Sequence, residues 1–240
     1  MIEFEGLTKK FGEKSAVDGL TFSVPQGATF GFIGPNGAGK TTTLRMLMGL
    51  LKPTAGRALI DGLDVTRQTL EVKKRVGYLP DEVFLYDYLT GQQFLEFVTE
   101  IRGLDLTTRR ERIKFYLEFF DLDNVAGDYT ANYSFGMKKK LALAGIVMHN
   151  PSVLILDEPF NGLDPQAVKD FRELLRKMVG EGTTIIFSSH VLEVVEKLVS
   201  HVGIIDQGKL RIVADIEELK RLHGGSLEKA FFDIVKPDKV

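Results

Sequence analysis

The segment 34–41, Gly-Pro-Asn-Gly-Ala-Gly-Lys-Thr, constrains this chain more than any other part of its sequence. It has the spacing Gly-x4-Gly-Lys-Thr, follows the apolar run 30–33, and precedes a stretch of helical character over 42–48. Glycines let such a loop turn its N–H groups toward phosphate oxygens, and the following helix presents its positive dipole end to the same anion. The alternative is a glycine-rich turn that carries Lys-Thr by chance, with odds of about one or two percent. The segment therefore predicts a phosphate-binding loop.

Two side chains of this loop indicate that its ligand is a nucleoside triphosphate. Lys40 can reach the β- and γ-phosphates and takes part in catalysis there, and the hydroxyl of Thr41 can ligate Mg²⁺. We expect the loop and the residue after it to contact the nucleotide: Gly34, Pro35, Asn36, Gly37, Ala38, Gly39, Lys40, Thr41 and Thr42.

The composition of the chain excludes several classes of protein that could contain such a loop. The 240 residues carry a net charge of −2, which argues against a nonspecific nucleic-acid binder, so no nucleic-acid partner is expected. No apolar run approaches the ~18 residues that span a bilayer. Residues 1–5 lack the basic and apolar regions of a secretory signal, and the chain has no cysteine. We expect a cytoplasmic protein.

The order of patterns along the chain predicts an α/β fold. Apolar and polar residues alternate at the two ends of the range 2–24, which is typical of half-buried antiparallel strands. The uninterrupted apolar run 153–156 is typical of a central parallel strand. We expect a P-loop NTPase core with a mixed sheet, an N-terminal antiparallel β subdomain and an inserted α-helical subdomain. The predicted boundaries are 1–86 and 151–214 for the core, 87–150 for the insert, and 215–240 for a short helical extension.

Four helix starts are predicted from capping signals. Thr90 with Gln93, and Thr108 with Glu111, fit the capping box, in which a hydroxyl and a carboxamide or carboxylate cap the helix reciprocally. Ser134 is expected to cap a helix that runs to about Met148. Asp164-Pro165 fits a cap followed by a proline at the first helical position.

Two carboxylates follow the apolar run 153–156. Asp157 at the end of a strand beside a phosphate loop can supply the second anchor for Mg²⁺, usually through its water shell. Glu158 can then face the γ-phosphate and polarise an attacking water. The alternative is that Asp-Glu-Pro only ends a strand and opens a solvated turn. The phosphate loop in the same sequence favours the catalytic interpretation over this alternative.

Two further side chains are candidates for the same site. His190 follows the predicted strand 183–187, and because sites of α/β proteins gather at the carboxyl ends of strands, it can hydrogen-bond the γ-phosphate. It can equally be a histidine that opens the next helix. Phe11 can stack on an adenine ring, although a phenylalanine near an N-terminus is more often part of the core.

The junction 133–140, Tyr-Ser-Phe-Gly-Met-Lys-Lys-Lys, has the form of a second anion site. A serine cap, a nearby glycine and a helix N-terminus together suit an anion. Because 34–41 already holds the phosphates, this junction reads as half of a site that is completed elsewhere. The alternative is an ordinary capped helix whose lysines are solvated.

Taken in order, these segments resemble the ATP-binding subunits of ABC transporters, and the resemblance covers nearly the whole chain. The matching segments are 34–41 (Walker A), 133–138 (signature loop), 154–158 (Walker B), 161–164 (D-loop) and His190 (switch histidine).

The resemblance implies a reaction and a set of partners. Two such subunits, two copies or a homologous pair, enclose two ATP-Mg²⁺ molecules and drive an integral-membrane permease, which places the chain on the inner face of the cell membrane. Glu158 is then the catalytic base, Thr41 and Asp157 lie at Mg²⁺, and His190 senses the γ-phosphate. Ser134, Gly136 and Met137 act on the nucleotide of the partner subunit. Phe11 stacks on the adenine.

The sequence departs from the usual family pattern in three segments. Phe135 and Met137 replace Gly and Gln of the common signature Leu-Ser-Gly-Gly-Gln, a form that resembles the branch serving exporter-like permeases. Asp81 stands where the family usually has a glutamine that contacts Mg²⁺ and the attacking water. A carboxylate there can bind the cation but adds negative charge near the γ-phosphate. Asn161 replaces the usual serine of the D-loop and keeps a hydrogen-bonding side chain.

The apolar and aromatic segment 83–89, which follows Asp81, is expected either to line a groove for a permease helix or to pack the core of the insert. The leading interpretation of the whole chain is the ATPase of an exporter. Two alternatives remain open from sequence, a soluble ABC ATPase that acts outside transport and a regulatory module with weak hydrolysis.

Overall fold

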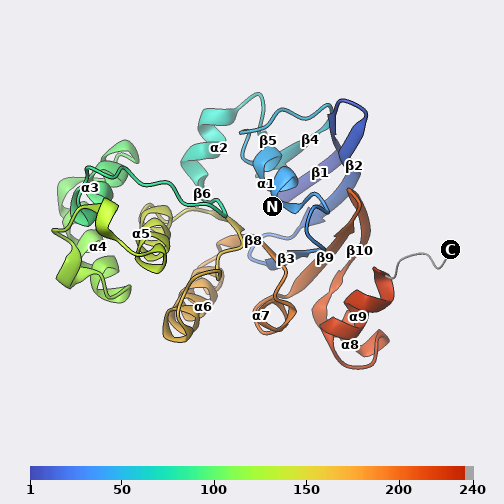
Figure 1. The fold of residues 1–240 in the computed structure, drawn as a ribbon. Helices are drawn as coiled ribbons and strands as arrows, with labels where there is room; N and C mark the ends of the chain where they lie inside the picture. Colours follow the sequence, from blue (N-terminus) through green and yellow to red (C-terminus); the bar gives the residue numbers. More distant parts are fainter. Residues whose placement is uncertain (236–240) are drawn as a thin grey trace.

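The computed structural model of the chain describes residues 1–235, which form two sheets with helices between and around them (Figure 1). The last five residues of the predicted extension over 215–240 lie outside the described residues. The mixed α/β fold and the N-terminal antiparallel sheet that the sequence predicts are confirmed. The boundaries drawn at 86 and 150 stay predictions.

The first sheet is antiparallel and comes from the N-terminal part of the chain. Its order is β2-β1-β4-β5. Its strands are β1 (Ile2–Phe11), β2 (Lys14–Val24), β4 (Ala55–Ile60) and β5 (Leu63–Asp64). Phe22 of β2 stacks on Phe4 at 4.3 Å and on Phe30 at 5.4 Å, so aromatic rings fill the space between this sheet and the second one.

The second sheet has six strands in the order β10-β9-β3-β8-β7-β6, of which all but β10 run parallel. The strands are β3 (Thr29–Ile33), β6 (Val76–Leu79), β7 (Val153–Asp157), β8 (Thr184–Ser189), β9 (His201–Asp206) and β10 (Lys209–Asp215). The central strands β3, β7 and β8 are buried throughout, and the uninterrupted apolar run 153–156 predicts this burial for β7.

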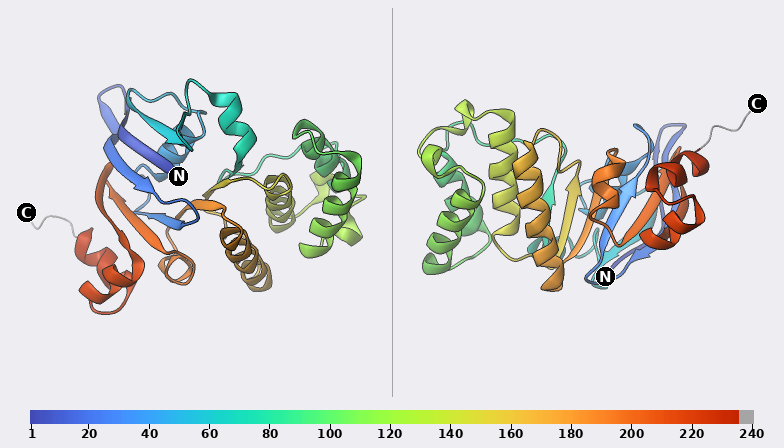
Figure 2. Two further views of the ribbon diagram at one scale, coloured as in Figure 1. Left: turned by 180° about the vertical axis from the view of Figure 1, so that it is seen from behind. Right: turned by 90° about the horizontal axis from the view of Figure 1, so that it is seen from below.

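Two groups of helices lie at opposite ends of the molecule, and the other helices lie around the sheets (Figures 1 and 2). They are α1 (Lys40–Leu47), α2 (Thr69–Arg75), α3 (Gly91–Ile101), α4 (Leu106–Phe119), α5 (Phe135–Val147), α6 (Pro165–Gly180), α7 (Leu192–Glu196), α8 (Ile216–Leu222) and α9 (Leu227–Ile234). We call α3, α4 and α5 the helical lobe; it lies at one end, and α8 and α9 lie at the other. No helix among residues 1–235 is long and apolar enough to cross a membrane.

Three of the four predicted helix caps are confirmed, and one is wrong. Thr90 and Gln93 form a complete capping box, and Ser134 and Asp164 accept hydrogen bonds from the first turns of α5 and α6. Thr108 lies inside α4, whose cap is Asp105; its carboxylate accepts N–H groups from Thr107 and Thr108. The physical reason is that aspartate is the stronger N-cap, and Asp105 stands one turn earlier.

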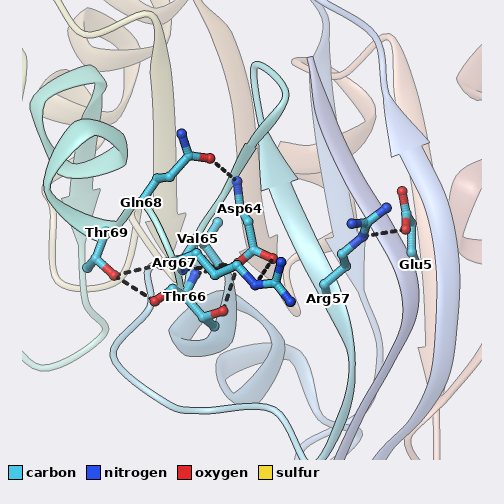
Figure 3. Close-up of polar contacts among 8 residues, drawn as sticks. All are labelled: Glu5, Arg57, Asp64, Val65, Thr66, Arg67, Gln68 and Thr69. Carbon is cyan, nitrogen blue, oxygen red and sulfur yellow. Dashed lines mark hydrogen bonds and ion pairs between the residues drawn. The ribbon is translucent and has the colours of Figure 1, made fainter.

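A compact cluster of hydrogen bonds joins β5 to α2 (Figure 3). The Asp64 carboxylate accepts from the N–H of Thr66 at 2.8 Å, from its hydroxyl at 2.7 Å, and from the N–H of Arg67 at 3.2 Å. Burial alone would raise the pKa of Asp64, but these hydrogen bonds outweigh it and hold the pKa below its usual value. The cluster fixes the start of α2, which leads the chain into β6 and the loop that carries Asp81.

Candidate active site

The carboxyl ends of three parallel strands bring the predicted site residues to one edge of the second sheet. Ile33, which ends β3, pairs with Ser189 of β8, and Asp157, which ends β7, pairs with Ser188 of the same strand. The phosphate loop, the two carboxylates and the serines therefore lie side by side, although more than a hundred residues separate them in sequence.

The phosphate loop is shaped by close approach of neighbouring backbone. Gly39, the N-cap of α1, has φ of 109°, and a Cβ there would lie 2.5 Å from the carbonyl oxygen of Ala16. The turn between β9 and β10 presses from another side, because Gly208 donates its N–H to the carbonyl of Ala38 at 3.0 Å. Only glycine fits position 39, so the loop keeps the backbone conformation that phosphate binding needs.

Lys40 is buried at the start of α1. Its Nζ donates to the carbonyl oxygens of Gly34 at 2.7 Å and Pro35 at 3.2 Å. Burial lowers the pKa of Lys40, while the negative charges of Glu158 and Asp157 oppose that shift. The ammonium is thus held over the loop by two neutral acceptors that an anion can replace.

A cavity of about 580 Å³ lies over the loop. It is lined by Phe11, Lys14, Ser15, Ala16, Asn36, Gly37, Gly39, Lys40, Thr41, Thr42, Asp81, Glu158, Gln207 and Gly208. Nine of these are predicted site residues, and the cavity is large enough for a nucleotide. The other predicted residues of the loop, Gly34, Pro35 and Ala38, belong to its turn without lining the cavity.

Asp157 lies just beneath this cavity and is almost fully buried. One carboxylate oxygen accepts a short hydrogen bond from the Ser188 hydroxyl, and the other, Oδ2, is buried without a hydrogen-bond partner among the described residues. A buried orphan oxygen carries a desolvation cost that a cation or its water shell would remove. With the Thr41 hydroxyl lining the cavity, the residues present fit Mg²⁺.

Glu158 is held in an unusual backbone conformation next to Asp157. Its φ is 47°, in the left-handed region, and its N–H donates to the hydroxyl oxygen of Ser188 at 3.0 Å. Its carboxylate lies at the cavity wall and is 3.0 Å from Nδ1 of His190. The imidazole of His190 is half exposed. It lies beside Glu158 and is not among the described residues that line the cavity.

Phe11 is 53% exposed and lies at the rim of the cavity. The expectation of a core phenylalanine is wrong, because β1 ends at this residue and carries the ring out of the sheet. Nζ of Lys9 lies 5.1 Å from the centroid of the ring, within cation–π distance. The ring therefore stands where an aromatic base could stack, which stays a prediction.

The signature residues lie apart from the cavity. The Ser134 hydroxyl accepts the N–H of Met137 at 3.3 Å and so caps α5, while Phe135 is exposed and lies against Gly162. None of Ser134, Gly136 and Met137 lines the cavity in the described part of the chain. The predicted second anion site is therefore on the surface of the helical lobe.

The three lysines after the signature loop do not share one environment. Lys138 forms an ion pair with Asp87 at 3.8 Å and Lys140 with Asp164 at 3.0 Å, while Lys139 has no exposed surface. The alternative of three solvated lysines is wrong for Lys139. Its aliphatic stem packs in the lobe and its ammonium reaches the carbonyl of Glu158.

Sequence reasoning missed five cavity-lining residues: Lys14, Ser15, Ala16, Gln207 and Gly208. The sequence marks 207–208 as a turn, but nothing in it shows that this turn packs on the phosphate loop. That contact arises because β9 pairs with β3 and its turn meets β2, through the bond from Asp18 N–H to the Gly208 carbonyl at 2.8 Å.

Comparison with known proteins decides the family. The family described as ABC transporter matches residues 17–161, which is more than half of the chain and runs from before the phosphate loop to past Glu158. This chain belongs to the ABC transporter family. It is an ATP-binding subunit of ABC type and an ATPase, because the matched part contains the phosphate loop and the Asp157-Glu158 segment, which the fold brings together.

Relatives of this ABC ATPase match it over most of its length. The bacitracin transport ATP-binding protein BcrA of Bacillus licheniformis is 39% identical over 229 residues, 95% of this chain and 74% of the relative. The daunorubicin resistance ATP-binding protein DrrA2 of Streptomyces coeruleorubidus is 40% identical over 226 residues, 93% of this chain and 70% of the relative.

Solved structures share the fold of this ABC ATPase. An ATP-binding subunit of an ABC transporter, 28% identical, superposes with a TM-score of 0.93 and covers 98% of this chain and 100% of that chain. A dimeric ATP-binding cassette in a post-hydrolysis state, bound to ADP and Pi, is 22% identical with a TM-score of 0.83, covering 90% and 99%. At 22% identity, the likeness to this dimeric cassette shows a shared fold alone.

Proposed function

We propose that this chain hydrolyses ATP for an exporter, as a dimer that closes around two nucleotides and drives a separate permease. The observation that carries the proposal is one sheet edge that holds Lys40, Thr41, Asp157 and Glu158 around a nucleotide-sized cavity. Relatives named for bacitracin transport and daunorubicin resistance support the direction of transport.

The proposed chemistry assigns one task to each side chain. Lys40 exchanges the carbonyls of Gly34 and Pro35 for phosphate oxygens of ATP, and its charge offsets the charge that develops on the γ-phosphoryl group. The Thr41 hydroxyl and the Asp157 carboxylate would hold Mg²⁺, which would neutralise further charge on the phosphates.

Glu158 is the proposed base. Its carboxylate accepts a proton from water as the water oxygen bonds to the γ-phosphorus, and the bond from that phosphorus to ADP breaks. His190, 3.0 Å from the Glu158 carboxylate, orients it and can donate to the γ-phosphate.

The proposed dimer follows from the exposure of the signature residues. In the described part of the chain, no residue at the N-terminus of α5 lines the cavity, yet this terminus has the serine and glycine that suit an anion. In the proposed dimer, Ser134, Gly136 and Met137 contact the nucleotide of the partner subunit. Phe11 stacks on the adenine within its own subunit.

A second, smaller cavity marks the proposed permease contact. It has a volume of about 230 Å³ and is lined by Tyr78, Leu79, Pro80, Val83, Phe84, Leu85, Phe94, Val98, Arg102, Ala142, Gly145 and Ile146. Phe84 is 84% exposed, whereas Val83 and Leu85 pack partly on the core of the lobe. The segment 83–89 therefore packs partly on the core and leaves Phe84 exposed, and we propose that a permease helix covers Phe84. Bound there, the subunit lies on the inner face of the membrane.

Replacing Phe84 with Glu tests that contact. We expect the variant to fold and bind ATP normally, because exposed substitutions change stability by only about 0.5 kcal/mol. We also expect the membrane-bound fraction of the protein in its native cells to fall. Leu70→Glu is the matched control, since Leu70 on α2 is 75% exposed and lies outside the cavity. Equal membrane binding of both variants would contradict the proposed contact.

Replacing Glu158 with Gln tests the proposed reaction. We expect ATP binding to persist and turnover to fall at least about a hundredfold, because the carboxamide cannot take the proton. Light scattering should then show a dimer that forms with ATP-Mg²⁺ and persists. Turnover at the parent rate would remove Glu158 from the role of base.

A further inference from the structure

Lys139 is the least expected charged residue of the helical lobe. It lies in the first turns of α5, two positions after Met137, and no part of its side chain is exposed to solvent. Burial of an ammonium is costly unless the charge finds partners. Lys138 and Lys140, its neighbours in sequence, instead pair with carboxylates at the surface.

The ammonium of Lys139 joins the lobe to two loops of the active site. Its Nζ donates to the main-chain carbonyl of Glu158 at 3.0 Å and to that of Asp81 at 3.3 Å. The first loop follows β7 and carries the proposed base. The second follows β6 and carries a cavity-lining carboxylate. One side chain from the signature helix thus touches both loops that line the γ-phosphate side of the cavity.

The contact with Glu158 acts on a backbone that needs support. The left-handed conformation of this non-glycine residue, φ 47°, costs about 1–2 kcal/mol. Ser188 holds the N–H of Glu158 from the sheet, and Lys139 holds its carbonyl from the lobe. The peptide groups on both sides of the Glu158 Cα are therefore fixed, and with them the direction of the Cα–Cβ bond from which its carboxylate extends.

The charge of Lys139 also faces the acidic side of the site. Burial lowers the pKa of Lys139, and the charges of Asp81, Asp157 and Glu158 oppose that shift. Asp81 adds a negative charge to the cavity wall where a phosphate must bind. A buried cation that bonds to the Asp81 carbonyl offsets part of that charge.

We propose that Lys139 is a positioning residue for ATP hydrolysis, which fixes Glu158 in its left-handed conformation and offsets the charge of Asp81. This proposal for Lys139 rests on the proposed role of Glu158 as the base. Lys139 lies on the helix that Ser134 caps, so its hydrogen bond connects the signature helix α5 with the Glu158 backbone. The alternative is a buried lysine that only stabilises the junction between lobe and core.

The test compares Lys139→Met and Lys139→Gln with the parent, with kcat expressed per nucleotide-binding site so that unfolded protein does not count. We expect kcat to fall about tenfold or more, since small displacements of a catalytic group are costly, and KM for ATP to change far less. Lys140→Met, which breaks only a partly exposed ion pair, should lower kcat less than Lys139→Met. Unchanged kcat per site in both Lys139 variants, whatever their melting temperature, would overturn the proposal.

A double variant tests the link to Asp81. If the Lys139 charge offsets that of Asp81, Lys139→Gln should cost less kcat in an Asp81→Asn background than in the parent, by a few-fold or more. Equal cost in both backgrounds would overturn that part. Glu158→Gln measured in parallel separates the two ideas. If Glu158→Gln keeps turnover, the proposed base is wrong; if it abolishes turnover while the Lys139 variants match the parent, only the inference on Lys139 is wrong.

Discussion

Two helix N-termini in this protein have anion-binding character, and they are built in opposite ways. No side chain in the described part of the chain caps α1, whose first turn opens into the cavity over the phosphate loop. By contrast, α5 is capped by Ser134, and its first residue, Phe135, is exposed on the lobe. The first terminus has its donors free for a ligand, and the second has used one of them.

The difference indicates what each terminus can do within one subunit. The terminus of α1 is held by close backbone contacts and is ready for phosphate. The terminus of α5 is an open surface, and the Ser134 hydroxyl can donate its O–H to an external phosphate while its oxygen accepts the Met137 N–H. The proposed head-to-tail dimer would bring the formed terminus of one subunit to the exposed terminus of the other.

The largest expected effect comes from adding one methyl group at the uncapped terminus. Gly39→Ala puts a Cβ 2.5 Å from the Ala16 carbonyl oxygen at a positive φ, so the loop must shift. Strain of about 1–3 kcal/mol predicts that the Kd for ATP rises tenfold or more. Titration with a fluorescent ATP analogue measures it. Gly37→Ala, with a positive φ but open space for its Cβ, should be milder; equal effects would show that backbone strain, not contact, shapes the loop.

The buried end of α5 predicts a pH dependence. His149, just after α5, bonds to the Val76 carbonyl through Nε2, and burial followed by the charge of Arg102 lowers its pKa to about 4. Between the unfolded pKa near 6.5 and about 4, the unfolded chain binds a proton that the folded chain does not. The contribution of neutral His149 to the free energy of unfolding is therefore complete above pH 6.5. It is lost as pH falls from 6.5 to about 4, by at most about 3 kcal/mol.

Urea unfolding of the parent and of His149→Asn at pH 7.5 and pH 4.5 measures that loss. We expect the free energy of unfolding of the parent to fall more between the two pH values, because asparagine does not titrate. The same fall in both proteins would mean that this end of α5 is open to water.

Mutation of the capped terminus of α5 should lower stability and leave ATP binding by the isolated subunit unchanged, whereas mutation at α1 should weaken ATP binding. Ser134→Ala removes the bond from the Met137 N–H and should lower the free energy of unfolding by about 1 kcal/mol. ATP binding by the isolated subunit should be unchanged, because Ser134 does not line its cavity. A weaker Kd for ATP at concentrations below dimer formation would contradict the comparison.

The smallest expected effect is at the rim of the cavity. Phe11→Ala should weaken ATP binding by about 1 kcal/mol if the ring stacks on adenine, with kcat nearly unchanged. Phe11→Tyr keeps the aromatic ring and should bind as the parent does. If alanine and tyrosine bind ATP equally well, Phe11 has no stacking role.

The sequence alone supports much of the fold, for reasons that are local. The phosphate loop is readable because spacing and glycine geometry are local, and the run 153–156 is readable because a fully buried strand is apolar throughout. The helix start at Thr108 was mistaken because a capping box needs only two residues, and Asp105 competes for the same helix. The short helices α2, α7 and α8 span two turns or fewer, too few for a periodic pattern.

The cavity shows where local reasoning ends. Lys14 and Gln207 line it only because β9 pairs with β3 and carries the β9–β10 turn onto β2. Lys139 is a stronger case, since a run of three lysines predicts a solvated surface. Its burial depends on carbonyls of Asp81 and Glu158 that tertiary folding brings together.

The claim that one nucleotide needs two subunits is tested most directly by mixing two inactive variants. Lys40→Ala disables the formed half-site and Ser134→Ala the exposed one, so a mixed dimer contains one site with both residues intact. We predict that ATP hydrolysis appears in the mixture and exceeds the sum of the separate rates. Lys40→Ala mixed with Glu158→Gln is the control, since both residues belong to the same half-site and no intact site can form. A Ser134→Ala mixture that stays as inactive as this control would contradict the account.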